Sequence, residues 1–219
     1  MRSSVSVAII GSGIAGTTLA RLLTDDIPSA EVTIFEKSRG VGGRMATRYS
    51  EEYEFDHGAQ FFTIRGGRFK KFLKRYESAF SEWPAATTTL SPDRKEYTRL
   101  WFETHYVGTP RMNSLCKKIA ENIDIQVRQQ ILGISGTPKQ RFLETEDGRF
   151  GPFDWIVSTA PAPQTQIIFN KPELSMPYSA AFALMVPVGE RPDFDAAVVR
   201  DSPVSWLAVT SSKPERCQH

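Results

Sequence analysis

The sequence predicts an α/β fold, in which a mostly parallel sheet carries helices and is joined to a small antiparallel meander. Two short apolar runs, Val5–Ile10 and Val32–Phe35, flank a helical stretch at Ile14–Leu23, which is the order of a β–α–β crossover. Apolar residues recur with helical spacing over Arg68–Phe80. After Asp124 the apolar period changes to two, which is typical of strands.

The first strand, Val5–Ile10, is followed by a glycine turn. Gly11, Gly13 and Gly16 have the spacing of a dinucleotide-binding turn. The first glycine permits a tight turn, the second lets a pyrophosphate approach the backbone, and the third lets the helix pack closely on the strand. The helix predicted over Ile14–Leu23 would direct its free N–H groups and its positive dipole end at the phosphates.

The second predicted strand, Val32–Phe35, ends at an acid. Glu36 lies twenty residues after Gly16, where a carboxylate can accept hydrogen bonds from both ribose hydroxyls of an adenosine and would repel a 2′-phosphate. The alternative interpretation is a solvated carboxylate at a strand end. The complete strand–turn–helix–strand–acid order favours the ribose contact.

A second glycine turn follows at once and separates the possible cofactors. Gly40, Gly42 and Gly43 precede Arg44. A domain that binds only a nicotinamide dinucleotide does not need this turn, whereas an extended FAD benefits from a close backbone and from a forked cation that offsets pyrophosphate charge. We therefore predict FAD as the cofactor, with an exposed surface cation as the alternative for Arg44.

The middle of the chain predicts helices and strand pieces. An amphipathic helix is expected over Arg68–Phe80, and its cationic face has two interpretations, a dock for phosphorylated substrate or nucleic acid, or, as we favour, a solvated surface. Residues Ala85–Arg99 are polar and turn-rich, which indicates strand pieces joined by loops. A helix from Pro110 to about Glu121 would bury a stripe of apolar side chains. The cationic face comprises Lys70, Lys71, Lys74 and Arg75, and the stripe comprises Met112, Leu115 and Ile119.

The period of two after Asp124 predicts an antiparallel meander. Asp147-Gly148 is a hairpin signal, and Asp154–Val157 should form a further apolar strand that stops at Ser158–Pro163. Thr159 in that loop is a candidate cofactor contact, with a loop lacking any ligand role as the alternative. The alternating residues assigned to the meander are Ile125, Val127, Ile131, Leu132, Ile134, Phe142 and Leu143.

Several segments resemble one family. The run SRGVGGRMATR followed by FDHGAQFFT resembles the renalase-like flavoproteins, relatives of the monoamine oxidase and glutathione reductase class of FAD-binding proteins. Tyr106–Ala120, Phe153–Gln164 and Trp206–Arg216 are also similar to that family. One position departs from the wider amine oxidase pattern, because Gly40 stands where an arginine is usual and Arg39 is displaced by one residue.

The resemblance implies a Rossmann-like FAD-binding domain with a β-meander, plus an incomplete α+β substrate domain. It implies a discontinuous FAD-binding domain over 1–64 and 104–164 and a partial substrate domain over 65–103 and 165–219. It also implies hydride transfer to flavin from a reduced nicotinamide dinucleotide, with oxygen as acceptor. The chain resembles roughly the first two-thirds of such proteins, so we expect weak FAD binding and marginal activity from this sequence alone.

Within FDHGAQFFT, adjacent Asp56 and His57 should point to opposite faces of an extended segment and make a poor acid–base pair. Gln60 can donate and accept hydrogen bonds beside the flavin N5 or the substrate, and is the candidate catalytic residue. The full set of candidate cofactor-binding residues is Gly11, Gly13, Ile14, Ala15, Gly16, Glu36, Lys37, Gly43, Arg44, Met45, Ala59, Gln60, Phe61 and Thr159.

Composition indicates an ordinary enzyme domain of 219 residues with a formal net charge of +2, which does not call for nucleic acid or a membrane surface as a partner. No apolar run is long enough for a membrane span, and His and Cys lack metal-ligand spacing. Cys116 should be a small buried residue and Cys217 a bystander, so a reducing cytoplasm is the expected compartment. The expected partner is a small-molecule substrate, and the oligomeric state is left open.

Three alternatives remain from the sequence. A flavin amine oxidase would share the cofactor but take an amine as substrate. A non-catalytic remnant would keep the nucleotide-binding turns without a complete pocket. A plain NAD dehydrogenase would leave the second glycine turn unexplained.

Overall fold

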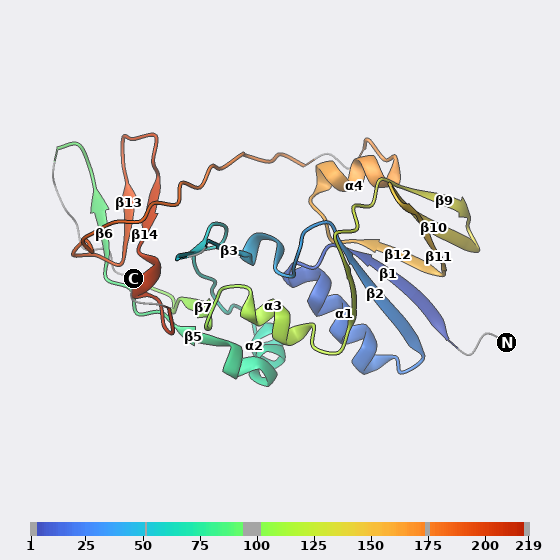
Figure 1. Ribbon diagram of the computed structural model, residues 1–219. Coiled ribbons are helices and arrows are strands. Elements are labelled where there is room, and N and C mark those ends of the chain that lie inside the picture. The colour runs from blue at the N-terminus through green and yellow to red at the C-terminus, as the bar shows by residue number, and fades with distance from the viewer. Residues whose placement is uncertain (1–3, 51, 94–101, 174–175, 217–219) are drawn as a thin grey trace. The chain divides into compact units, whose positions relative to one another are not determined.

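A computed structural model describes residues 4–50, 52–93, 102–173 and 176–216, which form two compact units (Figure 1). The first unit comprises Met1–Arg44 and Cys116–Phe182, and the second comprises Met45–Leu115 and Ala183–His219. Both units are discontinuous, and the divisions fall after residues 44, 115 and 182, whereas the domains that the family resemblance implies divide after 64, 103 and 164. Residues 45–64 join the second unit because they pair with one another and with its other segments.

The first unit contains a four-stranded parallel sheet of order β12-β1-β2-β8 (Figure 1). Strand β1 (Val5–Ile10) leads through helix α1 (Ile14–Asp26) to β2 (Ala30–Glu36). This is the predicted crossover, and the α/β, Rossmann-like fold class is confirmed.

Both faces of the sheet are buried over Val7–Ile10 of β1 and Ile34–Glu36 of β2, which explains the apolar residues on both faces of these stretches. Val7 and Ile9 pack with α1 on one face. Ala8, Ile10 and Phe35 pack on the other face against the meander of β9 (Gly133–Thr137), β10 (Gln140–Thr145) and β11 (Gly148–Phe153). The sheet and its two covering layers form the core of this unit.

The strand after Asp124 corrects one prediction. Strand β8 (Asp124–Val127) is not part of the antiparallel meander but pairs in parallel with β2, with Val127 opposite Glu36. A period of two identifies a strand but does not identify its partner. Strand β12 (Trp155–Ser158) pairs in parallel with β1, and the Asp147-Gly148 hairpin joins β10 to β11 as predicted.

Helix α4 (Ala162–Phe169) follows β12 and was not predicted. The expected loop over Ser158–Pro163 is therefore shorter, because Pro163 lies in the first helical turn, a position that needs no backbone N–H. Asn170 ends the helix in the left-handed conformation.

The second unit contains small sheets and short helices. A hairpin pairs β3 (Thr47–Tyr49) with β4 (Glu54–Asp56), and β5 (Phe80–Glu82) pairs with β7 (Tyr106–Gly108). A three-stranded sheet has the order β14 (Trp206–Ala208), β13 (Ala196–Val199) and β6 (Thr87–Leu90), and these strands lie side by side in Figure 1. Its other elements are α2 (Gly67–Leu73) and the 3-10 turns η2 (Lys74–Ala79) and η3 (Thr210–Ser212). The 3-10 turn η1 (Gly43–Met45) and helix α3 (Ser114–Ile119) fall at the chain divisions between the units, and most of each belongs to the first unit.

Two helix predictions are too long. The helix expected over Arg68–Phe80 becomes α2 and then η2, because Tyr76 leaves the helical region and Phe80 enters the β5–β7 pair. The helix expected from Pro110 begins at Ser114, because Pro110 lies in the preceding turn. Its apolar stripe is buried as predicted. Within the expected strand pieces of Ala85–Arg99, β6 is present and residues 94–99 lie outside the described part of the chain.

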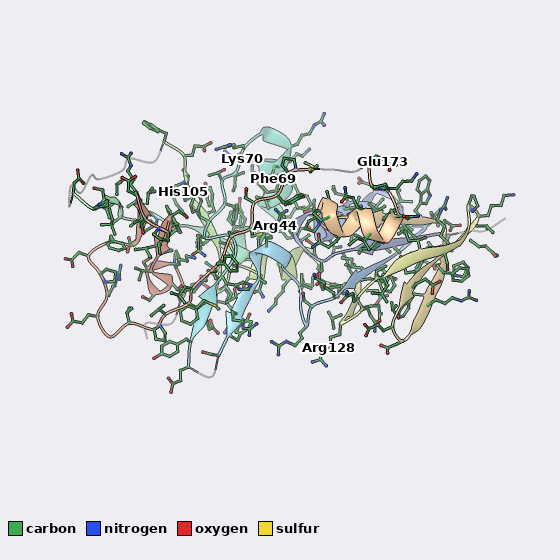
Figure 2. The ribbon with its side chains drawn as sticks, turned by 90° about the horizontal axis from the view of Figure 1, so that it is seen from above. Arg44, Phe69, Lys70, His105, Arg128 and Glu173 are labelled. Atoms are coloured by element: carbon green, nitrogen blue, oxygen red, sulfur yellow. The ribbon has the colours of Figure 1, made fainter. Side chains whose placement is uncertain are left out.

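Cys116 is buried, as predicted, and Cys217 lies outside the described residues. The four cations of the α2–η2 face are exposed, among them Lys70, labelled in Figure 2. In the parts of the chain that the structure describes, every helix is too short or too polar to cross a lipid bilayer.

Candidate functional site

The first glycine turn is fixed by contacts that only glycine allows. Gly11 has φ of +100°, and its N–H donates to the carbonyl of Phe35 at the end of β2. A Cβ on Gly16 would lie 2.0 Å from the carbonyl oxygen of Gly11. Helix α1 therefore packs against the turn closely enough to exclude any side chain at position 16.

The N-terminus of α1 is open to an anion. Gly13 is the N-cap, no side chain caps the helix, and its first turn contains no acid. The N–H groups of Ile14, Ala15 and Gly16 have no acceptor within the helix because of their position in the first turn. Ile14 is half-buried and Ala15 is exposed, so these donors border solvent. The arrangement fits a pyrophosphate.

Glu36 is buried at the carboxyl end of β2, beside the same turn. Its Oε2 accepts from the Ser12 N–H at 2.9 Å and from the Ser12 Oγ at 2.8 Å, and its Oε1 accepts from the Ser38 N–H at 2.8 Å. Burial acts to raise the pKa of this carboxyl, but the hydrogen bonds from Ser12 and Ser38 outweigh it and hold the pKa below its ordinary value. Glu36 is thus an ionised acceptor positioned by backbone amides.

The second glycine turn lies against the first. The Gly42 N–H donates to the Ser12 carbonyl at 3.0 Å, and a Cβ on Gly43 would lie 3.1 Å from the Cα of Gly13. The two turns, far apart in sequence, therefore meet backbone to backbone within the first unit. Arg44 follows the second turn, is exposed and is labelled in Figure 2; Lys37 is exposed as well.

Thr159 supports the first turn. Its hydroxyl is within hydrogen-bond distance of the carbonyls of Ile10 (3.0 Å) and Gly11 (3.1 Å), and it would contact a Cβ placed on Gly16. The hydroxyl thereby fastens β12 to the end of β1. Its predicted cofactor contact remains a prediction.

The end of β8 contributes a feature that the sequence did not indicate. Arg128 has φ of +59°, its N–H donates to the Ser38 carbonyl, and the Gln129 N–H donates to the Glu36 carbonyl. Arg128 is exposed (Figure 2). The sequence shows a basic residue directly after a predicted strand. That this residue lies beside Glu36 and Ser38 follows only from the parallel pairing of β8 with β2.

The remaining candidates lie in the second unit. Asp56 is buried and His57 is exposed, which confirms that they face opposite ways. Phe61 packs on His105, with ring centroids 4.0 Å apart. Met45 is buried, and Ala59, Gln60 and Phe61 are half-buried.

A buried ion cluster surrounds Asp56. Its Oδ2 lies 3.0 Å from Lys213 Nζ and 2.8 Å from Arg216 Nη2, and its Oδ1 accepts from the Thr47 hydroxyl at 2.8 Å. Burial opposes ionisation of Asp56, but the two cations and the hydrogen bonds from Arg216 and Thr47 bring its pKa below the ordinary value. Burial lowers the pKa of Lys213, although Asp56 acts in the opposite direction.

The sequence did not single out Lys213 or Arg216 as site residues. They lie 157 and 160 residues from Asp56, and no spacing rule connects them. The sequence did contain two cations close together in the run Lys213–Arg216, and a buried partner for them could have been sought among acids on predicted strands, such as Asp56.

Two cavities are lined by other residues, although Trp83 and His105, which line the first of them, contact Lys213 and Phe61. One of about 260 Å³ in the second unit is lined by residues 82–85 and 102–105, and one of about 270 Å³ in the first unit is lined by the meander, β12 and α4. Neither is bordered by a candidate site residue.

Comparison with known proteins agrees with the first unit. Residues 9–76 match the NAD(P)-binding Rossmann-like domain family. The chain is similar to the crystal structure of a candidate protoporphyrinogen oxidase from Exiguobacterium sp. 255-15, with 13% identity and a TM-score of 0.70 over 97% of this chain and 74% of the other. Because 571 solved chains match the fold, the likeness identifies an architecture rather than one reaction. The chain therefore contains a Rossmann-like domain of the NAD(P)-binding type within an α/β fold that it shares with this oxidase structure.

Proposed function

We propose that the protein is an FAD-dependent oxidoreductase of the renalase-like kind, which transfers hydride to flavin from a reduced nicotinamide dinucleotide and passes the electrons to oxygen. The observation that carries this proposal is the uncapped N-terminus of α1, bordered by two glycine turns that meet backbone to backbone and by the Glu36 carboxylate.

Each part of this arrangement suits one part of an ADP-containing cofactor. The first-turn N–H groups of α1 and the helix dipole would bind the pyrophosphate, and exposed Arg44 would offset its charge. Of the roughly four lone-pair sites of the Glu36 carboxylate, three accept hydrogen bonds from Ser12 and Ser38, and the remaining one, on Oε1, would accept a ribose hydroxyl. Its negative charge disfavours a 2′-phosphate at that place.

The second glycine turn supports FAD over NAD as the resident group. An NAD domain needs one such turn, whereas a cofactor extended along the β2 end would pass both. When bound, FAD supplies the hydride acceptor. The chain itself would bind the dinucleotide, exclude water from the reacting groups with apolar side chains such as Phe61, and orient the substrate through polar groups such as Gln60.

The test begins with the purified chain at equilibrium with excess FAD across a dialysis membrane, because the sequence leads us to expect weak binding. We expect flavin absorbance with the protein and release of FAD, identified by chromatography, after denaturation. Anaerobic addition of a dihydronicotinamide dinucleotide should bleach the flavin, and oxygen should restore it with formation of hydrogen peroxide.

The outcomes separate the competing functions. Bleaching by amines but not by dihydronicotinamides would establish a flavin amine oxidase instead. Bound FAD that neither substrate reduces would indicate a non-catalytic dinucleotide-binding domain. Retention of NAD without any affinity for flavin would contradict the proposal and favour a plain dehydrogenase.

A further inference from the structure

Lys213 connects the two ends of one short segment of the second unit, residues 56–60. Its Nζ donates to Asp56 Oδ2 at 3.0 Å and to Gln60 Oε1 at 3.1 Å. The carboxamide nitrogen of Gln60 donates in turn to the backbone carbonyls of Asp56 and Gly58. The Lys213 ammonium group and the Gln60 amide therefore link both ends of residues 56–60 by hydrogen bonds.

Lys213 is itself held in place. Its side chain is fully buried. Its Nζ lies over the Trp83 ring, 5.4 Å from the ring centre, which adds a cation–π contact to its two hydrogen bonds. The Trp83 indole N–H donates to Ser212 Oγ at 3.2 Å, and that hydroxyl donates to the Val209 carbonyl. Trp83 thus fixes both the ammonium group and the turn η3 that precedes it.

The charge balance shows that Lys213 is not needed to neutralise Asp56. The cluster contains one carboxylate and two cations. The single positive charge of Arg216, with Nη2 2.8 Å from Asp56 Oδ2, would be enough to balance that carboxylate, and Arg216 also donates to the carbonyls of Gly108 and Pro110. Thr47 satisfies the other carboxylate oxygen. Burying Lys213 as a second cation costs free energy of desolvation, and charge balance does not account for that cost. Its contact with Gln60 suggests another role for the ammonium group.

We propose that Lys213 is a positioning residue, which fixes the Gln60 carboxamide and the backbone of residues 57–60 in one conformation. Its consequence for turnover rests on the proposed function, in which Gln60 borders the reacting groups. A carboxamide has two orientations that differ by exchange of oxygen and nitrogen, and a cationic donor on one side admits only the orientation with Oε1 toward it. Lys213 therefore fixes the orientation of the carboxamide, with Oε1 toward the ammonium group and the amide nitrogen toward the carbonyls of Asp56 and Gly58.

The direct test is amide hydrogen exchange by NMR on the full chain, which does not depend on cofactor binding. In Lys213→Met we expect the amides of residues 57–60 to exchange about tenfold faster or more, while the rest of the second unit stays within about twofold of wild type. The exposed Lys74, in the same unit, provides the matched control Lys74→Met. Unchanged exchange at 57–60, or an equal increase throughout the unit, would overturn the proposal.

A second variant keeps the buried ion pairs and so guards against misfolding. Gln60→Leu removes the acceptor of Lys213 and, with it, the amide donor to the carbonyls of Asp56 and Gly58. The side chain is half-buried, and we expect the same local increase over residues 57–60. Because both substitutions break the shared contact between Lys213 and Gln60, the double variant should exchange no more than about twofold faster than either single variant. Multiplying effects in the double variant would contradict the shared role.

A kinetic comparison then examines the catalytic consequence. In the reconstituted enzyme, Lys213→Met should lower kcat about tenfold and leave KM and FAD affinity within about twofold, because the group being positioned acts on the reacting atoms. An unchanged kcat would remove Lys213 from catalysis. If wild type shows no flavin-dependent turnover, the proposed function fails, while the exchange result still decides the positioning role.

Discussion

The two units each bury a carboxylate, and they neutralise it by different means. Glu36 is 6% exposed and accepts hydrogen bonds from the N–H groups of Ser12 and Ser38, and within the described part of the chain it forms no ion pair. Asp56 is 4% exposed and lies between two buried cations. Backbone dipoles stabilise the charge of Glu36, whereas two cationic side chains, Lys213 and Arg216, stabilise that of Asp56.

The two carboxylates therefore belong to sites of different kinds. The site at Glu36 has donors free to bind a ligand, whereas the cluster at Asp56 holds neighbouring residues in place. At Glu36 the donors of the neighbouring α1 N-terminus remain available, so an incoming pyrophosphate finds partners already oriented. At Asp56 most donors are already engaged within the unit. We therefore assign binding to the first region and positioning to the second, and the following substitutions test that division.

The largest effect is expected for Asp56→Asn. This change leaves two buried cations without a counter-charge, and we expect it to lower the free energy of unfolding by about 3–5 kcal/mol. Chemical denaturation measures the loss, with the exposed Asp193→Asn as control. Adding Lys213→Met to Asp56→Asn should recover part of the stability, and no recovery would contradict the role of charge balance.

A smaller loss is expected for Gly16→Ala in the first unit. Its Cβ would meet the Gly11 carbonyl at 2.0 Å, and this backbone atom cannot move without opening the turn, so we expect destabilisation of about 3 kcal/mol. Gly40→Ala is the matched control, because a Cβ there would have no heavy atom within 4 Å. Equal stability of the two variants in thermal unfolding would show that the turn is not tightly packed.

Glu36→Gln tests the dipole-stabilised carboxylate. The neutral amide turns one donor toward the Ser12 or Ser38 N–H, and we expect a loss of about 1–2 kcal/mol at pH 7. The exposed Glu31, on the same strand, supplies the control Glu31→Gln. FAD affinity, measured by fluorescence titration, should fall as well, since the ribose acceptor is weakened; full retention would exclude Glu36 as that acceptor.

The pH dependence of this variant follows from the direction of the pKa shift. The pKa of Glu36 is lower in the folded protein than its ordinary value of 4.5. Its contribution is therefore complete above pH 4.5 and is lost as the pH falls through the folded value. The stability difference between wild type and Glu36→Gln should shrink below pH 4.5, and a constant difference down to pH 3 would contradict the assignment.

The smallest structural effect is expected for Arg44→Ala. The side chain is exposed, so unfolding should change by less than about 0.5 kcal/mol. FAD binding should nevertheless weaken about tenfold, because the pyrophosphate loses a charged donor. The exposed Arg39→Ala, before the second turn, is the control, and equal effects of both variants on affinity would reduce Arg44 to a general surface charge.

The first unit was predictable in most respects because its signals are local. Strand β1, the turn from Gly11 to Gly16, and Glu36 occupy one stretch in which spacing and backbone chemistry determine the geometry. Strand β8 was assigned to the wrong sheet, because alternation of apolar and polar residues indicates a strand but does not indicate which strand it pairs with. The contact between Gly13 and Gly43 was not deduced either, since it depends on how the second turn folds back.

The second unit was less predictable because its key contacts are distant. Asp56 meets Lys213 across 157 residues, and the cost of burying these charges is balanced only in the folded unit. Gln60 was recognised as a candidate, but its partner was not. The end of the helix expected over Arg68–Phe80 was also decided by tertiary pairing, when Phe80 joined β7 instead of extending the helix.

The most direct test of the account compares FAD with FMN as ligands of the wild-type chain by isothermal titration calorimetry. FMN shares the reactive ring but lacks the pyrophosphate bridge and adenosine to which we assign α1, the two glycine turns and Glu36. We expect FAD to bind at least about tenfold more tightly than FMN, with one site per chain. Equal affinities, or no binding of FAD, would contradict the central claim that the first unit recognises the dinucleotide half of the cofactor.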